Sequence, residues 1–298
     1  MKLKSKNLTV STPQFCMFTM PSCSVCIAGW IMNNMNNCLI GFSGFVGSTI
    51  AKQTAFESVY RSTTIGHIEG HSFNTVVCAG APAQKWIANR EPEADRQKIE
   101  GLIAHLKTIQ CNTFILISTV DVFSTVMGVD EDTPVDESGL HAYGLHRRLL
   151  ETFVESHFPN HLIVRLPGLV GPGLRKNVIF DFLNDNNLQA IDSRGVFQFY
   201  PMVNLWYDIQ TALNAGLKLV HLTAEPISVA DVSQLGFGRQ FTNALANPAA
   251  TYDMQTKHAH VFGAAGRYQY SARETVQAVR AYAQSEPLTI KVDEGAKI

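Results

Sequence analysis

Short apolar runs alternate with longer amphipathic segments along the chain from residue 37 to about residue 166. The apolar runs at 37–41, 73–80 and 113–119 are nearly continuous, as in strands of a parallel sheet that is covered on both faces. Between them, apolar residues recur three and four positions apart, which predicts helices. This alternation predicts an α/β fold of the Rossmann type, built around a doubly wound parallel sheet.

The loss of this alternation after residue 166 divides the chain. The predicted Rossmann domain covers 37–166, and a smaller C-terminal lobe covers 167–298, with a returning strand and helix at 221–235. In the helix at 143–157 the residues expected to face the sheet are Leu145, Leu149, Phe153 and Val154.

The first 36 residues have a different composition from the rest. Their only charges are three lysines, and four of the six cysteines fall within the first 38 residues. A signal peptide is one interpretation, but Pro21 interrupts the apolar stretch and no clear cleavage site follows. A metal site at Cys23 and Cys26 is a second, but this pair lacks a matching second pair. We expect a loosely ordered extension at 1–36, and no metal site.

Composition limits the class of protein and of partner. Of the 298 residues, 46% are apolar and 16% are charged, which excludes a disordered chain. Lys and Arg number 24 and Asp and Glu number 25, so no basic excess favours nucleic acid or an anionic membrane surface. Phosphate binding, if present, must come from local groups.

Three glycines lie between the first predicted strand and a helix at 48–56. Gly41 permits a tight turn, Gly44 allows the backbone to approach a pyrophosphate, and Gly47 allows the helix to pack closely on the strand. The helix N-terminus offers free N–H groups to an anion. This strand–turn–helix arrangement predicts a dinucleotide site, although glycine turns also occur in unrelated α/β proteins.

The end of the second predicted strand, at 58–62, bears on the choice of cofactor. An acidic residue there would bind the ribose 2′-hydroxyl of NAD, but no acid occurs before Glu69. Arg61 and Ser62 suit a 2′-phosphate instead. The cofactor is therefore expected to be NAD(P), with a preference for NADP.

Two further segments carry candidate chemistry. Ser118 and Thr119 end a buried strand, and Tyr143 opens a predicted helix. Arg147 follows Tyr143 by four residues, so the two share one helical face. The segment 162–173 is a strand that runs into a loop rich in glycine and proline.

With these motifs in this order, the chain resembles the extended short-chain dehydrogenase/reductase superfamily, the NAD(P)-dependent sugar-nucleotide epimerases, dehydratases and reductases. The resemblance covers about residues 37–240 and implies that Tyr143 is the general acid/base and that Thr119 hydrogen-bonds the same substrate oxygen. Arg147 stands where the family has a lysine that stabilises the phenolate. The cofactor-binding residues that the glycine turn and the resemblance imply are Gly41, Gly44, Phe45, Val46, Gly47, Arg61, Ser62, Ala79, Gly80, Ala81, Tyr143, Arg147 and Pro167.

The departures from the family pattern separate the possible functions. Dehydratases of the family resemble Thr-Asp-Glu where this chain has Thr119, Val120 and Asp121, so we expect an epimerase or a keto-reductase acting on a nucleotide-activated sugar. Because Arg147 replaces the lysine, the alternative is a non-catalytic NAD(P)-binding regulatory or structural protein. A reductase for a small carbonyl substrate is a third possibility.

The resemblance also implies a substrate pocket and partners. A solvated basic pair is the other interpretation of Arg175 and Lys176. The protein is expected to be cytoplasmic and possibly homodimeric through the helices at 93–110 and 143–157, with no nucleic acid or membrane partner. Candidate substrate contacts are Asp121, Arg175, Lys176, Asn177, Gln198 and Tyr200.

Overall fold

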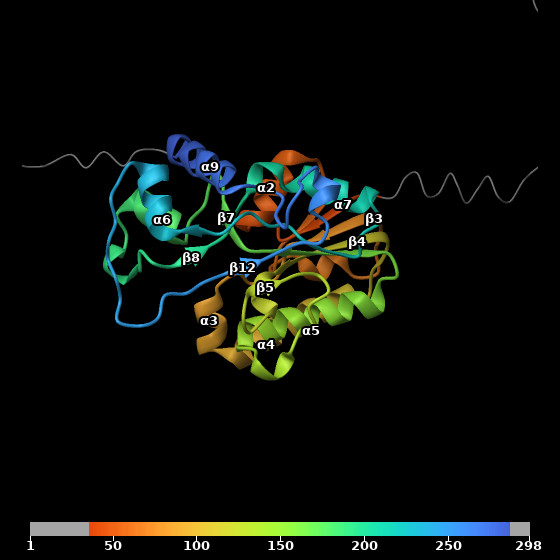
Figure 1. The fold of residues 1–298 in the computed structure, drawn as a ribbon. Coiled ribbons are helices and arrows are strands. Elements are labelled where there is room, and N and C mark those ends of the chain that lie inside the picture. The colour runs from red at the N-terminus through yellow and green to blue at the C-terminus, as the bar shows by residue number, and fades with distance from the viewer. Residues whose placement is uncertain (1–35, 287–298) are drawn as a thin grey trace, which may run out of the picture. The chain divides into compact units, whose positions relative to one another are not determined.

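A computed structural model of the chain describes residues 36–286, so the expectations for the N-terminal extension lie outside the described residues. Its centre is a sheet of six parallel strands in the order β10-β6-β4-β3-β1-β2 (Figure 1). This confirms the predicted α/β class. The strands are β1 (Cys38–Ile40), β2 (Ser58–Tyr60), β3 (Ser72–Cys78), β4 (Gln110–Thr119), β6 (His161–Leu166) and β10 (Leu219–His221).

Helices cover both faces of this sheet. Along β4, Phe114 and Leu116 pack with α4 (Pro92–Leu106) and α5 (Ala142–His157), while Ile115 and Ile117 pack on the other face. That other face is covered by α2 (Phe45–Gln53) and α7 (Leu205–Asn214) (Figure 1). Continuous apolar strands are therefore required, because each successive side chain meets a different helical layer.

The strand order reverses at β1, which lies between β2 and β3. In doubly wound sheets this switch point is where ligands bind, beyond the carboxyl ends of the strands. The strand β2 forms the edge of the sheet. Between β2 and β3 the chain forms only a short 3-10 turn, Ile65–Ile68. The glycine turn after β1 thus opens at the switch point.

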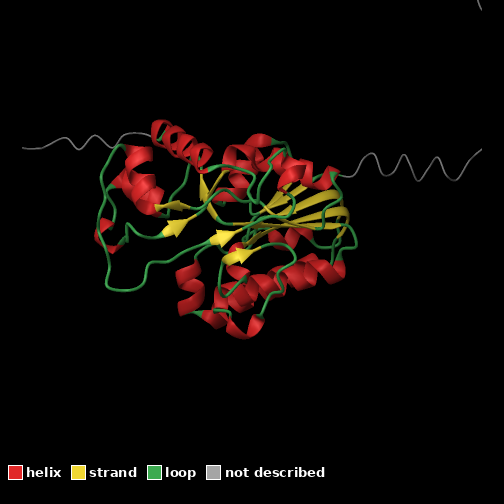
Figure 2. Cartoon of the chain, in the orientation of Figure 1, coloured by secondary structure: helices red, strands yellow, loops and turns green. Residues whose placement is uncertain are grey.

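The C-terminal part returns to the sheet and also builds small structures beside it (Figure 2). The returning strand β10 ends at His221, earlier than predicted, and α9 (Ala272–Ser285) was not anticipated although Ser271 and Glu274 form a capping box at its start. The remaining elements are α3 (Lys85–Arg90), α6 (Val178–Asn184), α8 (Val229–Asp231), β5 (Met127–Val129), β7 (Gly168–Val170), β8 (Val196–Phe197), β9 (Phe199–Pro201), β11 (Ile227–Ser228) and β12 (Asp253–Met254).

The face that α5 turns to the sheet agrees with the prediction in its second half and differs in its first half. Leu145 and Leu149 are 36% and 38% exposed, whereas Arg147 and Glu151 are buried. Val154 is fully buried and Phe153 packs against the core, as predicted. Arg147 and Glu151 also face inward because each finds a buried partner of opposite charge, so hydrophobicity alone misplaced Leu145 and Leu149. Within residues 36–286, every helix is too short or too polar to cross a membrane.

Candidate active site

The glycine turn combines two glycines that the fold requires with one that it does not. A Cβ on Gly41, whose φ is +87°, would lie 2.3 Å from the carbonyl oxygen of Ala79, and a Cβ on Gly47 would lie 2.1 Å from the carbonyl oxygen of Gly41. Gly44 is exposed, and a Cβ there would meet nothing closer than 3.5 Å. The open space in front of Gly44 is the feature that a closely approaching pyrophosphate needs.

The N-terminus of α2 extends this site. Gly44 is its N-cap, no side chain caps it, and its first turn carries no acidic residue. Uncapped N–H groups and the helix dipole favour an anion here. Of the other residues expected at the cofactor, Arg61 and Ser62 are exposed after β2, and Phe45, Val46, Ala79, Gly80, Ala81 and Pro167 are half-buried.

The end of β4 and the start of α5 bring Thr119 and Tyr143 together. Thr119 Oγ1 accepts the N–H of Asp121 at 3.2 Å, which shapes the turn after the strand. A Cβ on Gly144 would lie 2.1 Å from the carbonyl oxygen of Asp121, so only glycine lets α5 start this close to β4. The His141 ring caps the helix by accepting the N–H of Gly144.

The phenol of Tyr143 lies among charges of both signs. Burial raises its pKa above the ordinary value, and Asp121 raises it further. Arg147, a side-chain hydrogen bond with Thr119, and Lys85 lower it. In the ligand-free chain the phenol is therefore protonated at neutral pH, and it is ready to donate a proton to a substrate oxygen.

Arg147 is anchored at the base of the site. Its guanidinium bonds both oxygens of Asp95, with 3.0 Å from Nη2 to Oδ1, and donates to the carbonyl oxygen of Pro82. It also lies 4.0 Å from the centre of the Tyr143 ring, stacked on the ring face. Its buried Nε has no partner in the described chain, which leaves one donor for a ligand such as a ribose hydroxyl.

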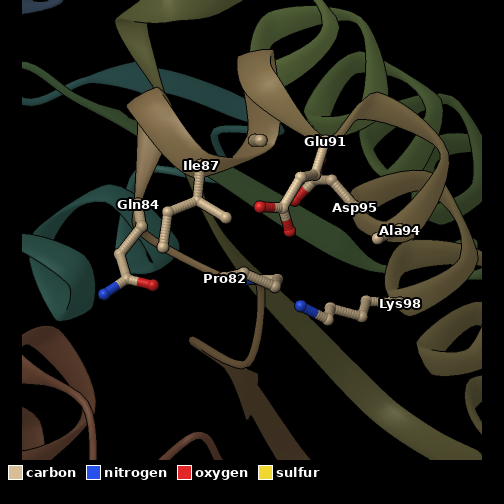
Figure 3. Close-up of a pocket in the computed structure, with 8 residues that line it drawn as sticks. Pro82, Gln84, Ile87, Glu91, Ala94, Asp95 and Lys98 are labelled. Atoms are coloured by element: carbon tan, nitrogen blue, oxygen red, sulfur yellow. The ribbon is translucent and has the colours of Figure 1, made fainter.

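Asp95 connects this anchor to the surface. His146 Nδ1 lies 2.7 Å from Asp95 Oδ2, so two residues of α5 share one carboxylate of α4. Figure 3 shows Asp95 at a shallow pocket between α3, α4 and the loop after β3. The pocket is lined by Pro82, Gln84, Ile87, Ala88, Glu91, Ala94, Asp95 and Lys98.

Helix α3 brings two residues to the site that the sequence analysis missed. Lys85 Nζ lies 2.7 Å from Asp121 Oδ1 and 3.4 Å from the hydroxyl of Tyr252. Asn89 Oδ1 accepts the N–H of Tyr143 at 2.9 Å. The helix has only six residues, too few for a clear periodic pattern. The sequence therefore gives no local sign of these two side chains, whose partners are 36 and 54 residues away.

The expected substrate residues separate into accessible and buried ones. Arg175 is exposed, and Lys176 reaches the carbonyl oxygen of Ala83 after β3. Asn177, with φ of +97°, caps α6 through its Oδ1.

Gln198 and Tyr200 are buried, with exposed fractions of 1% and 0%. The Gln198 amide bonds Thr223, Ala224 and Met254, and the Tyr200 hydroxyl donates to Asp208 at 2.6 Å. Internal partners take up their polar atoms, so the structure gives these two no support as substrate contacts.

Solved structures share this fold at low sequence identity. UDP-glucose 4-epimerase from Thermotoga maritima, solved with UDP-glucose, has a TM-score of 0.62 at 13% identity, covering 84% of this chain and 98% of its own. The NAD-dependent NDP-hexosamine 5,6-dehydratase TunA has a TM-score of 0.66 at 15% identity, covering 85% of this chain and 99% of its own. RMD from Pseudomonas aeruginosa, complexed with NADPH, has a TM-score of 0.64 at 15% identity, covering 84% of this chain and 99% of its own. No family model and no curated protein sequence matches the chain.

Proposed function

We propose that this chain, which has the fold of the extended short-chain dehydrogenases/reductases, is an NAD(P)-dependent epimerase or keto-reductase for a nucleotide-activated sugar. The observation that carries the proposal is the convergence of Thr119 and Tyr143 at the carboxyl edge of the sheet, the edge at which the turn at Gly44 also lies. Solved neighbours described with UDP-glucose and with NADPH support the ligand classes.

The residues present fit a dinucleotide. Gly44 and the N-terminus of α2 would hold the pyrophosphate, and the free Nε of Arg147 would donate to a ribose oxygen. A bound nicotinamide supplies the acceptor or donor for hydride. The chain itself handles the proton: the Tyr143 phenol exchanges it with a sugar oxygen, which the Thr119 hydroxyl holds in place.

The surroundings of Asp121 support an epimerase or reductase over a dehydratase. Elimination of water needs an acid for the leaving hydroxyl and a base for the carbon. Val120 is buried and apolar, and Asp121 is paired with Lys85, so no pair of free carboxylates follows Thr119. Proton exchange by Tyr143 serves both remaining reactions.

The test is Tyr143→Phe, assayed by nicotinamide absorbance and product analysis over a panel of nucleotide sugars. We expect kcat to fall by about 10²–10⁴-fold while cofactor still raises the melting temperature. Tyr207→Phe is the matched control, because Tyr207 is 76% exposed. A Tyr143→Phe enzyme with full turnover would exclude this role for the phenol.

A second candidate function is a cofactor-binding protein without turnover. The pairing of Arg147 with Asp95 favours it, since a carboxylate neutralises the cation that stands where the family has its lysine. This candidate predicts thermal stabilisation by NAD(P) and no turnover of any nucleotide sugar.

The cofactor preference rests on Arg61, which is exposed at the end of β2 and forms no ion pair within the described residues. Arg61→Ala should weaken NADPH binding about 10-fold, the loss of one charge-assisted hydrogen bond, and leave NADH binding unchanged. Equal weakening of both, by calorimetry, would remove the preference.

A further inference from the structure

Three polar side chains from distant parts of the chain meet beside Thr119. The ammonium of Lys85, at the start of α3, lies 2.7 Å from Asp121 Oδ1 and 3.4 Å from the hydroxyl of Tyr252. Asp121 belongs to the turn after β4, and its N–H donates to Thr119 Oγ1 at 3.2 Å. The polar triad of Lys85, Asp121 and Tyr252 therefore lies next to the hydroxyl that is expected to hold the reacting sugar oxygen.

Neighbouring strands fix Tyr252 in this place. Tyr252 immediately precedes β12, which pairs with β5 (Figure 1), and its N–H donates to the carbonyl oxygen of Val196 at 2.9 Å. The centre of its ring also lies 5.5 Å from that of Phe197. The C-terminal part of the chain thus presents a held phenol to Lys85, which is 167 residues away in sequence.

Each member of the triad keeps one polar group open. An ammonium has three donors, and within residues 36–286 Asp121 and Tyr252 take two of those of Lys85. No group among these residues donates to Asp121 Oδ2 or accepts the hydroxyl hydrogen of Tyr252. The side chains of Lys85 and Asp121 are 38% and 18% exposed, so a ligand can reach them. The triad thus offers two donors and one acceptor side by side.

We propose that this triad is a subsite that binds a neutral hydroxyl of the substrate sugar and rejects a carboxylate at the same place. A hydroxyl both donates and accepts, so it can donate to Asp121 Oδ2 and accept from Lys85 or Tyr252. A carboxylate only accepts, and it would lie against the charge of Asp121. The subsite rests on the proposed function, which brings a sugar oxygen to Thr119.

The balance of charge within the triad sets this preference. Burial opposes the charge of Lys85, but Asp121 prevails and raises its pKa, so Lys85 carries its proton at neutral pH. Because the Asp121 carboxylate is paired with this ammonium, no net positive charge remains to attract an anionic sugar. Lys176 also reaches the loop before α3, but its ammonium donates to the carbonyl oxygen of Ala83.

The test is calorimetric binding of two probes that differ at one carbon, UDP-glucose and UDP-glucuronic acid. The full chain is kept with NADH or NADPH, because a reduced nicotinamide cannot take hydride from the sugar. We expect the wild type to bind UDP-glucose about 10-fold more tightly. Asp121→Asn should abolish this preference. Lys85→Met should increase it about 10-fold further, because UDP-glucuronic acid then meets an unbalanced Asp121.

The phenol and the folding of the variants need their own controls. Tyr252→Phe should weaken UDP-glucose binding by about 3–10-fold, the loss of one hydrogen bond. Tyr207→Phe is the matched control, because Tyr207 is 76% exposed on α7. Circular dichroism checks that each variant folds. If Lys85→Met does not fold, Lys85→Gln removes the charge and keeps a donor for Asp121, and the same increase in preference is expected.

The outcomes separate the subsite from the proposed function. Preferences that move in opposite directions in the two charge variants would support the subsite, since a purely structural ion pair would weaken both probes alike. Equal binding of both probes to the wild type, or a preference that neither charge variant moves, would overturn the subsite alone. If neither probe binds, the proposed function fails for UDP-sugars and the subsite falls with it.

Discussion

Two buried arginine–carboxylate pairs lie one turn apart on the inner face of α5, and they are built differently. Glu151 meets Arg165 of β6 at 2.8 Å, with a bond from Ser118 at 2.6 Å, and Arg165 also contacts His221. All three nitrogens of Arg165 have partners, and Glu151 is fully buried. Arg148 also donates to Glu151, at 3.0 Å. The side-chain polar atoms of both Glu151 and Arg165 therefore all have partners within the protein, and in this sense we call the pair closed.

The Arg147–Asp95 pair is open by comparison. Among residues 36–286, no partner reaches the Nε of Arg147, and Asp95 lines a pocket at the surface. A closed pair contributes to the fold only, whereas an open pair beside Tyr143 can also respond to a ligand. The difference separates the part of α5 that supports the sheet from the part that serves the site.

Glu151→Ala should give the largest effect. It leaves Arg165 buried without its counter-charge, and loss of one partner from such a pair costs about 3–5 kcal/mol of the free energy of unfolding. Urea denaturation measures it. Glu155→Ala is the matched control, because Glu155 is a partly exposed partner of Arg148 on the same helix, and should cost at most about 1 kcal/mol. Equal losses in the two variants would mean that the Glu151 pair is not closed.

Stability against acid should also depend on the closed pair. Burial lowers the pKa of His221 to about 4, and Arg165 lowers it too. The unfolded chain, with an ordinary pKa of about 6.5, therefore binds more protons than the folded chain between these values. Stability should be complete above pH 6.5 and fall as the pH drops to 4, by on the order of 3 kcal/mol.

The histidine variant assigns that pH dependence. His221→Gln should flatten the stability curve between pH 4 and pH 6.5, measured by urea denaturation at each pH. Arg165 holds the pKa of Glu151 below its ordinary value against the opposing effect of burial. The stability that Glu151 contributes is therefore present across this range and is lost only as the pH falls further. An unchanged slope in His221→Gln would place the acid sensitivity outside this cluster.

These contrasts also show what the sequence could predict. Local patterns predict the strands of the parallel sheet and the glycine turn. They also place Thr119 at the end of a strand and Tyr143 at the start of a helix, because each of these features depends on residues that are close in sequence. The anchoring of Arg147 does not, because Asp95 is 52 residues away and its burial depends on how α4 packs on α5. Lys85 is hidden for the same reason. Partners distant in sequence decide which way a charged side chain turns.

Asp95→Asn should have a smaller effect than Glu151→Ala. The amide oxygen can still accept a bond from Arg147, and water can enter from the pocket, so we expect a loss of about 1–3 kcal/mol in urea denaturation. The charge on Arg147 is then unbalanced, so Tyr143 should titrate at lower pH. Glu91→Gln is the control, because Glu91 is an exposed acid at the same pocket. A loss as large as that of Glu151→Ala would show that the two pairs are equivalent.

Arg147→Lys should have the smallest effect on stability and is the most informative about why arginine occupies this position. An ammonium cannot span both Asp95 oxygens and the carbonyl of Pro82, so bonds are lost. The same substitution also removes the buried Nε–H that has no partner, and this offsets part of the loss. We expect a net cost of about 1 kcal/mol in urea denaturation. A cost near that of Glu151→Ala would mean that the fold itself demands the arginine, whereas a small cost leaves ligand binding as the reason for its free nitrogen.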